Sequence, residues 1–391
     1  MKENESALYS HYIIDGVRFD MTPAEMLDEC MEYEDGDNPE YEDFGRFDDI
    51  IDELTDLPVT SFTYDRSENT RYAEDLAGIS NDERAFTMLY PDHFTRLQIA
   101  QALLNRLWSE GHFRLGNLRI WAQWEWNTRP IGNMAAFYSS AAAASEYIYG
   151  LGVRMTDYLF IENDGESSAK FFAWLPEGMK EDNEDDVRNE WDGLFKSSPY
   201  ESRHPWISDS RRCPSTISDC LESTIVYVPF DTCPFKLGGT LLAQSKGHNG
   251  GPGAQIMDPD YFIDCYEVVR ELIEDGVVIA GISVGDGGLA TAAARMCRKN
   301  GAGLDISRLM ASYGENDSTK VLFGETPGVL VQIKDCDFDY FDSQMILQDI
   351  AYYPLGSPDK AAEGVKFIDN HQNGVADILA ALMNQASEGE D

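Results

Sequence analysis

A glycine-rich turn between a strand-like and a helix-like segment is the part of the sequence best suited to bind a ligand. Val277–Val284 is a largely apolar, β-branched run, which is typical of a buried strand. Gly285-Asp286-Gly287-Gly288 follows, and Leu289–Lys299 then places apolar residues at helical spacing. Backbone N–H groups at such a turn and helix N-terminus can hold a phosphate. A tight turn that needs glycine only for its dihedral angles is the alternative.

Other residue types that could do chemistry are sparse. A second glycine-rich run, Gly247–Gly253, departs from the P-loop pattern and is favoured as a loop rather than a phosphate cradle. His248 within this run is expected to be exposed and is not favoured as a ligand. The seven cysteines are scattered and lack the CxxC spacing of zinc sites, which indicates reduced thiols in a cytosolic protein.

Apolar periodicity predicts the elements that must position these residues. Asp92–Trp108 has apolar side chains along one side of a helix, and Leu118–Trp126 is rich in residues that favour strands. Tyr158–Glu162 and Ala169–Trp174 are expected to pair as a hairpin around Asn163-Asp164-Gly165. The other predicted helices are Thr22–Met31 (with a capping box), Phe47–Leu54, Met134–Tyr149, Asp258–Asp275 and Gly374–Gln385. The other predicted strands are Tyr12–Phe19, Val59–Tyr64, Ser223–Phe230 and Val329–Lys334.

The composition is strongly acidic. The 391 residues include 70 Asp and Glu against 30 Lys and Arg, a formal charge of −40. We expect no direct binding to nucleic acid and no membrane association, since such a polyanion is repelled by phosphates and no apolar run could span a bilayer. Glu25–Asp56 is especially acidic, and Glu32–Asp43 and Glu177–Glu190 are expected to be solvated loops. Three explanations of the charge stay open: solubility, a basic protein partner, and mimicry of nucleic acid.

Several segments together resemble the second half of phosphoribosylformylglycinamidine (FGAM) synthase, which belongs to the aminoimidazole ribonucleotide (AIR) synthase superfamily. Ile282–Leu289 is similar to the family's HDxSDGGL, and Lys236–Gln244 to its RLGGTALAQ. Leu322–Gln332 resembles LFxExxGxxxQ, and Leu89–Asn105 resembles LLDPxxxARxAVAEALTN. The matches occur in the family's order, from about Phe47 to the C-terminus.

The resemblance also implies catalytic and metal-binding positions, and the sequence departs from the family at several of them. Ile282 occupies the register of the catalytic histidine, so no catalytic residue is assigned, because isoleucine has no proton to move. The glutamate and asparagine that face Mg²⁺ in the family match Gln101 and Asn105. The amide at position 101 removes a charge that Mg²⁺ prefers. The family's GKDS segment, GxATAxGE hairpin, first synthase half and glutaminase domain have no counterpart.

From the resemblance we expect an α+β protein built as a two-domain AIR synthase-like half, with an N-terminal barrel-forming sheet domain and a C-terminal α/β sandwich domain. The expected division is an acidic segment at 1–57 and domains at 58–206 and 207–391. Glu325 matches a family acid and is expected at the surface. The candidate nucleotide- or phosphate-binding residues are Gly285, Asp286, Gly287, Gly288, Gly238, Gly239 and Gln244, and the candidate metal positions are Gln101 and Asn105.

Two functional hypotheses follow. In the first, the chain is a synthase-like half of purine biosynthesis, which binds ATP or ADP with Mg²⁺ and works with partners on formylglycinamide ribonucleotide (FGAR), although it is catalytically degenerate on its own. In the second, it is a non-catalytic pseudoenzyme, an acidic binding or regulatory protein for a basic partner or a mimic of nucleic-acid charge. The superfamily pairs its N-terminal sheets, which implies a homodimer or pairing with a related synthase half. A cytoplasmic location is expected.

Overall fold

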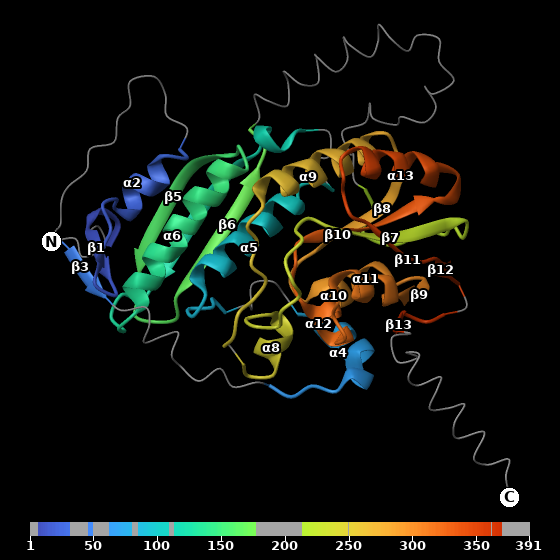
Figure 1. Ribbon diagram of the computed structural model, residues 1–391, viewed down its shortest axis with the longest axis horizontal. Helices are drawn as coiled ribbons and strands as arrows, with labels where there is room; N and C mark the ends of the chain where they lie inside the picture. Colours follow the sequence, from blue (N-terminus) through green and yellow to red (C-terminus); the bar gives the residue numbers. More distant parts are fainter. Residues whose placement is uncertain are drawn as a thin grey trace, which may run out of the picture.

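The computed structural model describes residues 7–31, 46–49, 62–79, 85–108, 113–176, 213–248, 250–360 and 362–369 (Figure 1). The loops predicted over Glu32–Asp43 and Glu177–Glu190 and the helix predicted over Gly374–Gln385 lie outside the described residues. Within the described ranges, no helix is both long enough and apolar enough to cross a membrane.

A three-stranded sheet backed by two helices forms the left-hand block in Figure 1. The sheet has the strand order β5 (Arg154–Glu162), β4 (Arg119–Trp126), β6 (Ser168–Trp174). The helices are α5 (Pro91–Leu104) and α6 (Asn133–Gly150), and both were predicted. Trp124 and Trp126 of β4 are fully buried, and the Trp124 indole donates from Nε1 to Ser140 Oγ of α6 at 3.0 Å. The strand predicted over Leu118–Trp126 is therefore confirmed.

The hairpin predicted for this block is wrong, although both of its strands exist. β4 lies between β5 and β6, and it pairs with β5 in parallel and with β6 in antiparallel register. The connection passes the end of β4, where the N–H of Asn163 donates to the carbonyl of Trp126 at 2.9 Å. A central position keeps both edges of this most buried strand paired, whereas a hairpin of β5 with β6 would leave β4 at an edge.

A small sheet and a short helix extend this block. The sheet has the order β2 (Val17–Arg18), β1 (His11–Ile14), β3 (Arg46–Asp49), so the strand predicted over Tyr12–Phe19 is divided by a turn. The helix α2 (Pro23–Asp28) begins with the predicted capping box of Thr22 and Glu25.

The helix predicted over Phe47–Leu54 is wrong in the part that is described. Residues 46–49 form β3, which pairs in parallel with β1. The Phe47 ring packs on Tyr12, with 5.4 Å between the ring centroids. This long-range contact decides the conformation of a segment whose own apolar spacing favours a helix.

A four-stranded antiparallel sheet with helices on both faces forms the right-hand block (Figure 1). Its strand order is β11 (Tyr353–Gly356), β7 (Ser223–Pro229), β10 (Gly328–Lys334), β8 (Val278–Val284). Helices α9 (Pro259–Glu274) and α13 (Phe338–Leu347) pack with one face, and α10 (Gly288–Met296) and α12 (Ser318–Phe323) with the other. The strands and helices predicted at β7, β8, β10, α9 and α10 are confirmed.

The remaining described elements complete this block. A second sheet has the order β12 (Pro358–Asp359), β9 (Gly301–Asp305), β13 (Val365–Ile368). The further helices are α4 (Asn69–Ala77), α8 (Leu241–Ser245) and α11 (Ser307–Tyr313), with 3₁₀ turns η1 (Arg66–Glu68), η3 (Leu115–Asn117) and η5 (Asp335–Asp337). Separate sheets with their own helices make the fold α+β, as predicted.

The two blocks share one hydrophobic core. Tyr147 of α6 and Phe262 of α9 pack edge to face, with 6.4 Å between their ring centroids. Asn69 of α4 accepts a hydrogen bond from Thr319 at 3.0 Å, so α4 packs on the right-hand block. The described part of the strand predicted over Val59–Tyr64, residues 62–64, is not a strand. The predicted domain limits at 57 and 206 lie outside the described residues and stay a prediction.

Candidate functional site

The glycine turn lies between β8 and α10, as predicted, and close packing requires its glycines. Gly287 and Gly288 have φ angles of +79° and +68°, which strain any residue with a side chain. A Cβ at Gly288 would lie 2.6 Å from the carbonyl oxygen of Leu322, and one at Gly285 would lie 1.4 Å from Oε1 of Gln101. A turn that needs glycine for its conformation therefore accounts for these residues without a ligand.

A buried carboxylate already occupies one side of this turn. Glu325 is 2% exposed, and it accepts hydrogen bonds from the N–H of Gly287 at 2.8 Å and of Leu241 at 2.7 Å. The prediction that Glu325 is a surface residue is therefore wrong. The N–H of Gly288 donates to the carbonyl of Gly285 at 2.7 Å. Two donors of the predicted phosphate cradle are thus used within the protein, and phosphate binding there stays a prediction.

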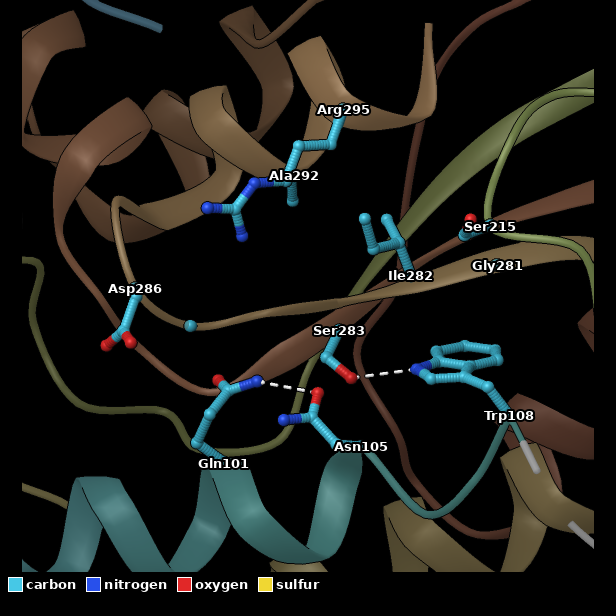
Figure 2. Close-up of a pocket in the computed structure, with 11 residues that line it drawn as sticks. Gln101, Asn105, Trp108, Ser215, Gly281, Ile282, Ser283, Asp286, Ala292 and Arg295 are labelled. Atoms are coloured by element: carbon cyan, nitrogen blue, oxygen red, sulfur yellow. Dashed lines mark hydrogen bonds between the residues drawn. The ribbon is translucent and has the colours of Figure 1, made fainter. Parts of the chain in front are cut away.

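Gln101 and Asn105 lie one helical turn apart at the C-terminal end of α5 and face the glycine turn (Figure 2). Gln101 donates from Nε2 to Oδ1 of Asn105 at 3.0 Å. Gln101 Oε1 is buried beside Gly285 without a hydrogen-bond partner. The two amide side chains therefore bond to one another, and Gln101 also packs against the glycine turn.

This donor set does not fit a magnesium ion. Mg²⁺ favours carboxylate oxygens in a near-octahedral arrangement. In the described chain, Asp286 is the only carboxylate that lines the cavities beside the pair, and the Asn105 oxygen is already taken by an N–H of Gln101. The described residues also contain no group of three or more His, Cys, Asp or Glu that could hold a metal. The geometry gives no support to the metal role predicted for Gln101 and Asn105.

Two adjoining cavities open beside this pair. The first has a volume of about 240 Å³ and lies between α5, β8, α10 and the segment at Ser215 (Figure 2). The second has a volume of about 230 Å³ and lies between α5 and β6. Gln101, Asn105 and Asp286 line both cavities. The aromatic lining of the second cavity consists of Phe86, Phe94, Phe171 and Phe172.

The ionisable groups of the first cavity, within the described chain, are Asp286 and Arg295. Arg295 projects from α10 and donates from Nε to the carbonyl of Ala77 at 3.4 Å and from Nη2 to that of Ile79 at 3.3 Å. Burial lowers the pKa of the Arg295 guanidinium, and the negative charge of Asp286 opposes this shift. Ile282 adds an apolar wall where the family has its histidine. Among the described residues that line this cavity, none is a histidine that could move a proton.

The segment that matches the family's substrate-side glycines lines neither cavity. A Cβ at Gly238 would lie 2.1 Å from the carbonyl oxygen of Gly251, and Gly239 has a φ of +65°. Gln244 accepts from the N–H of Ala85 at 3.1 Å and donates to its carbonyl at 3.0 Å. These contacts are structural, and ligand binding by the three residues stays a prediction.

Two further predictions concern a histidine and the thiols. His248 is half-buried and packs on the Phe62 ring at 5.5 Å, so the expected exposure is wrong. All seven cysteines are unpaired, as predicted. Burial raises the pKa of four thiols to about 12, which disfavours the reactive thiolate. These are Cys30, Cys213, Cys233 and Cys297.

Comparison with known proteins agrees with this architecture. Residues 234–335 match the family model described as AIR synthase related protein, C-terminal domain. The chain is 24% identical over 278 residues to a probable FGAM synthase, chloroplastic/mitochondrial, of Arabidopsis thaliana, over 69% of this chain and 18% of that protein. It is 27% identical over 113 residues to the FGAM synthase of Homo sapiens, over 29% of this chain and 8% of that protein.

Solved structures show the same fold. The structure of T. maritima PurL complexed with FGAR has a TM-score of 0.52 and 12% sequence identity, over 74% of this chain and 43% of that chain. The fold is therefore of the AIR synthase-related class. Within that class, the sequence is similar to FGAM synthases over part of their length, which agrees with the resemblance seen in its motifs. It spans 18% of the length of the plant relative.

Sequence reasoning does not single out three residues that shape the first cavity: Trp108, Ser283 and Arg295. The Trp108 indole donates from Nε1 to Ser283 Oγ at 2.8 Å, a contact across 175 residues of sequence. Arg295 does carry a signal, because it follows Ala292 by three residues and so shares its face of the helix. The sequence alone therefore identifies Arg295 as a cationic residue on the Ala292 face of the helix that follows the glycine turn.

Proposed function

We propose that this chain is a non-catalytic FGAM synthase-like protein of purine biosynthesis, which keeps the ligand cleft of a synthase half but does not itself form the amidine. The observation that carries the proposal is the contact of Gln101 with Asn105 and Gly285. An amide stands where the family's carboxylate faces Mg²⁺, and its N–H is directed at the oxygen of the neighbouring position. Ile282 supplies no proton in place of the family's histidine.

Turnover of FGAR tests this proposal directly. FGAR is the ligand in the T. maritima PurL structure, so it is the substrate to offer. The purified chain is incubated with FGAR, ATP and Mg²⁺, with ammonium as the nitrogen source so that no glutaminase is needed. We expect no FGAR-dependent formation of ADP. Formation of ADP in proportion to protein concentration, and absent without FGAR, would refute the proposal.

We further propose that the outer face of the sheet β5-β4-β6 pairs with a second copy of the chain or with a related synthase half. Leu159, Phe172 and Trp174 are 42%, 49% and 38% exposed there. The Phe172 ring also packs beside Trp121, with 5.5 Å between the ring centroids. Apolar side chains gathered on one sheet face favour an interface.

Sedimentation of the purified chain tests the pairing with a second copy. We expect a dimer that Phe172→Asp dissociates, because a charge is then buried between the sheets. The matched control is Leu221→Asp, which changes a side chain that is 50% exposed and lies outside this sheet. A wild-type chain that stays monomeric at every concentration would reject pairing with a second copy. The related synthase half would then be the remaining proposed partner.

The net charge of −40 favours a second candidate function, the binding of a basic protein in the cytoplasm. Deleting the whole acidic stretch would not test it, because Leu27 is buried in the core and Asp49 caps a helix. Replacing the carboxylates of residues 32–43 by amides is the better variant. We expect weaker, less salt-sensitive binding of a lysine-rich peptide, measured by fluorescence anisotropy. Unchanged binding would reject that segment as the docking site.

A further inference from the structure

Helix α13 presents apolar side chains to solvent on the face turned away from the core. Its inner stripe packs in the same core as α9 and consists of Phe338, Phe341 and Met345. On the outer face, Tyr340, Ile346 and Leu347 are 45%, 66% and 73% exposed. Leu347 is the most exposed large apolar side chain of the described chain. A surface helix normally carries polar residues on its outer face, so packing of the core does not account for these three.

The three exposed side chains lie on one side of the helix, and we call them the α13 face. Tyr340 and Leu347 are seven positions apart, which is about two helical turns, and Ile346 adjoins Leu347. α13 lies at the outer edge of the right-hand block (Figure 1). Single exposed apolar residues are common on proteins, whereas a group of them on one helix favours an interface.

Carboxylates border the α13 face on the side of Ile346. Residues 335–349 contain five aspartates and neither lysine nor arginine. Asp339 and Asp342 lie seven and four positions before Ile346, so the three share one side of the helix. Asp339 is in the first turn, where the helix dipole favours an acid, but Asp342 and Asp349 lie beyond that turn. The helix dipole therefore does not account for the whole acidic stretch.

Further carboxylates lie on the side of Tyr340. Its hydroxyl donates at 2.9 Å to Oδ2 of Asp275, the residue that follows α9. Burial and the hydrogen bond to Asp275 raise the pKa of Tyr340 to about 12, and the charge of Glu271 adds to this shift. The Glu271 side chain is 59% exposed, although it pairs with Arg270. The α13 face therefore lies between two groups of negative charge.

We propose that the α13 face is a docking surface for a basic amphipathic segment of a partner protein. Apolar side chains of that segment cover Tyr340, Ile346 and Leu347, and its lysines or arginines pair with the carboxylates on both borders. Apolar anchors supply affinity in such a contact, and complementary charge selects the partner. The inference rests on the second candidate function, since it gives the basic partner a folded docking surface.

The charge pattern separates this partner from other occupants. A second copy of the chain carries the same net charge of −40 and is repelled by the acidic borders. Residues 370–391 contain four acidic residues and neither lysine nor arginine, so their charge does not complement the borders. Residues 203–212 contain three arginines together with Trp206 and Ile207, which makes them the competing occupant within the chain.

Binding of a synthetic peptide to the full chain tests the proposal. The probe is a fluorescently labelled peptide of leucine and lysine with leucines at helix positions i, i+3, i+4 and i+7, and binding is measured by anisotropy. The control peptide has the same composition, with its leucines distributed around the helix. We expect the amphipathic peptide to bind about fivefold more tightly than the control peptide, or better.

A substitution on the α13 face locates the apolar contact. We expect Ile346→Gln to weaken binding of the amphipathic peptide by about fivefold or more, because an apolar anchor is lost. The matched control is Ile131→Gln, since Ile131 is also 66% exposed but precedes α6 in the left-hand block. Both side chains are at the surface, so neither change disturbs the core.

A second pair of variants tests the charged border. Asp339→Asn combined with Asp349→Asn should weaken binding by about threefold or more and reduce its dependence on NaCl. Asparagine tolerates the positive φ of 53° at position 349. The control, Asp20→Asn combined with Asp164→Asn, removes the same net charge from side chains that are 93% and 73% exposed in the left-hand block.

Four results would overturn the proposal. Two are equal binding of the two peptides and equal weakening by Ile346→Gln and Ile131→Gln. The third is binding that appears only when Arg203, Arg211 and Arg212 are changed to glutamine, which would assign the face to residues 203–212. The fourth is a dimer of the chain that Ile346→Gln dissociates, which would assign the face to a second copy.

The same measurements distinguish this inference from the functions on which it rests. A chain that binds the lysine-rich peptide through residues 32–43, but does not prefer the amphipathic peptide, would refute the α13 face alone. A chain that binds neither peptide would refute the second candidate function as well. FGAR-dependent turnover would refute the non-catalytic proposal and leave the docking surface intact.

Discussion

Ile282 gives the cavity an apolar wall beside Ser283, and a histidine there would restore a group able to carry a proton. We expect Ile282→His to show no FGAR-dependent formation of ADP. The amide of Gln101 would still engage the Asn105 oxygen, and Asp286 would still be the only carboxylate in the described lining. The matched comparison is Ile282→His combined with Gln101→Glu, measured in the same assay. Turnover by the single variant would show that the histidine alone had been limiting.

Glu325 joins two glycine-rich segments through one carboxylate oxygen, which accepts from the N–H groups of Leu241 and Gly287. Glu325→Ala leaves both groups buried without an acceptor, at a cost of about 1 to 3 kcal/mol each. We therefore expect the free energy of unfolding to fall by about 2 to 6 kcal/mol, measured in urea. Glu325→Gln keeps an acceptor oxygen and should lose less. Equal losses for the two variants would contradict the role of the hydrogen bonds.

The glycine turn and Glu325 show how much of the site the sequence can predict. The glycines of the turn could be predicted because their conformational need is local and falls between a strand pattern and a helix pattern. The role of Glu325 could not, because its partners lie 38 and 84 residues away. The same holds for Gln101, whose contact with Gly285 joins separate parts of the chain. Sequence spacing places a residue on an element, but tertiary packing decides what it meets.

Helix α6 begins on an acceptor that comes from another element. Its N-cap is Gly132, which has no side chain to cap the helix. Asp49 of β3 instead accepts from the N–H groups of Gly132, Met134 and Ala135 at 2.8, 3.0 and 3.1 Å. A carboxylate at a helix N-terminus is favoured both by these bonds and by the helix dipole. β3 therefore stabilises the helix that packs on the central strand β4.

Replacing this carboxylate should weaken the fold measurably. We expect Asp49→Ala to lower the free energy of unfolding by about 1 to 2 kcal/mol, and Asp49→Asn to lower it less, since the amide keeps one acceptor. The measurement is urea unfolding followed by circular dichroism. The control is Asp20→Ala, because the Asp20 side chain is 93% exposed and forms an ion pair with Arg18 at the surface. A loss for Asp49→Ala no larger than that of the control would reject the capping role.

The elements that could be predicted are those with long, regular patterns. Helices α5, α6 and α9 and strands β4 and β8 lie where apolar periodicity predicts them. The failures concern pairing, which no local pattern encodes. β3 has the apolar spacing of a helix but pairs with β1, and β5 and β6 resemble a hairpin but lie on either side of β4. In each case, a contact far along the chain outweighs the local preference.

The cleft depends on both blocks. Gln101 and Asn105 come from α5 in the left-hand block, whereas Asp286 and Arg295 come from the turn and helix of the right-hand block (Figure 2). The packing of α6 on α9 fixes these two sets relative to one another. Since α4 also packs on α10 and supplies the Ala77 carbonyl to Arg295, its position sets where the guanidinium points. Ligand affinity should therefore respond to changes at the block interface as well as in the lining.

The net charge of −40 makes the compact chain repel itself, and salt should relieve this. Raising NaCl from about 0.01 M to about 1 M shortens the Debye length from about 30 Å to about 3 Å. We expect the thermal midpoint to rise across this range, measured by differential scanning fluorimetry, with a neutral osmolyte series as the control. Salt also weakens ion pairs, such as those of Arg270 with Glu267, Glu271 and Glu274.

The stability gained when salt screens the repulsion between carboxylates should outweigh the stability lost when salt weakens the ion pairs. Exposed ion pairs contribute only about 0 to 1 kcal/mol each, and 30 basic residues cannot neutralise 70 acidic ones. The Arg270 side chain is 7% exposed. Because burial shields its ion pairs from solvent ions, these pairs respond weakly to salt. Every unpaired carboxylate, by contrast, gains from screening. A midpoint that falls as NaCl is added would mean that local ion pairs, rather than the excess charge, dominate the electrostatics of this fold.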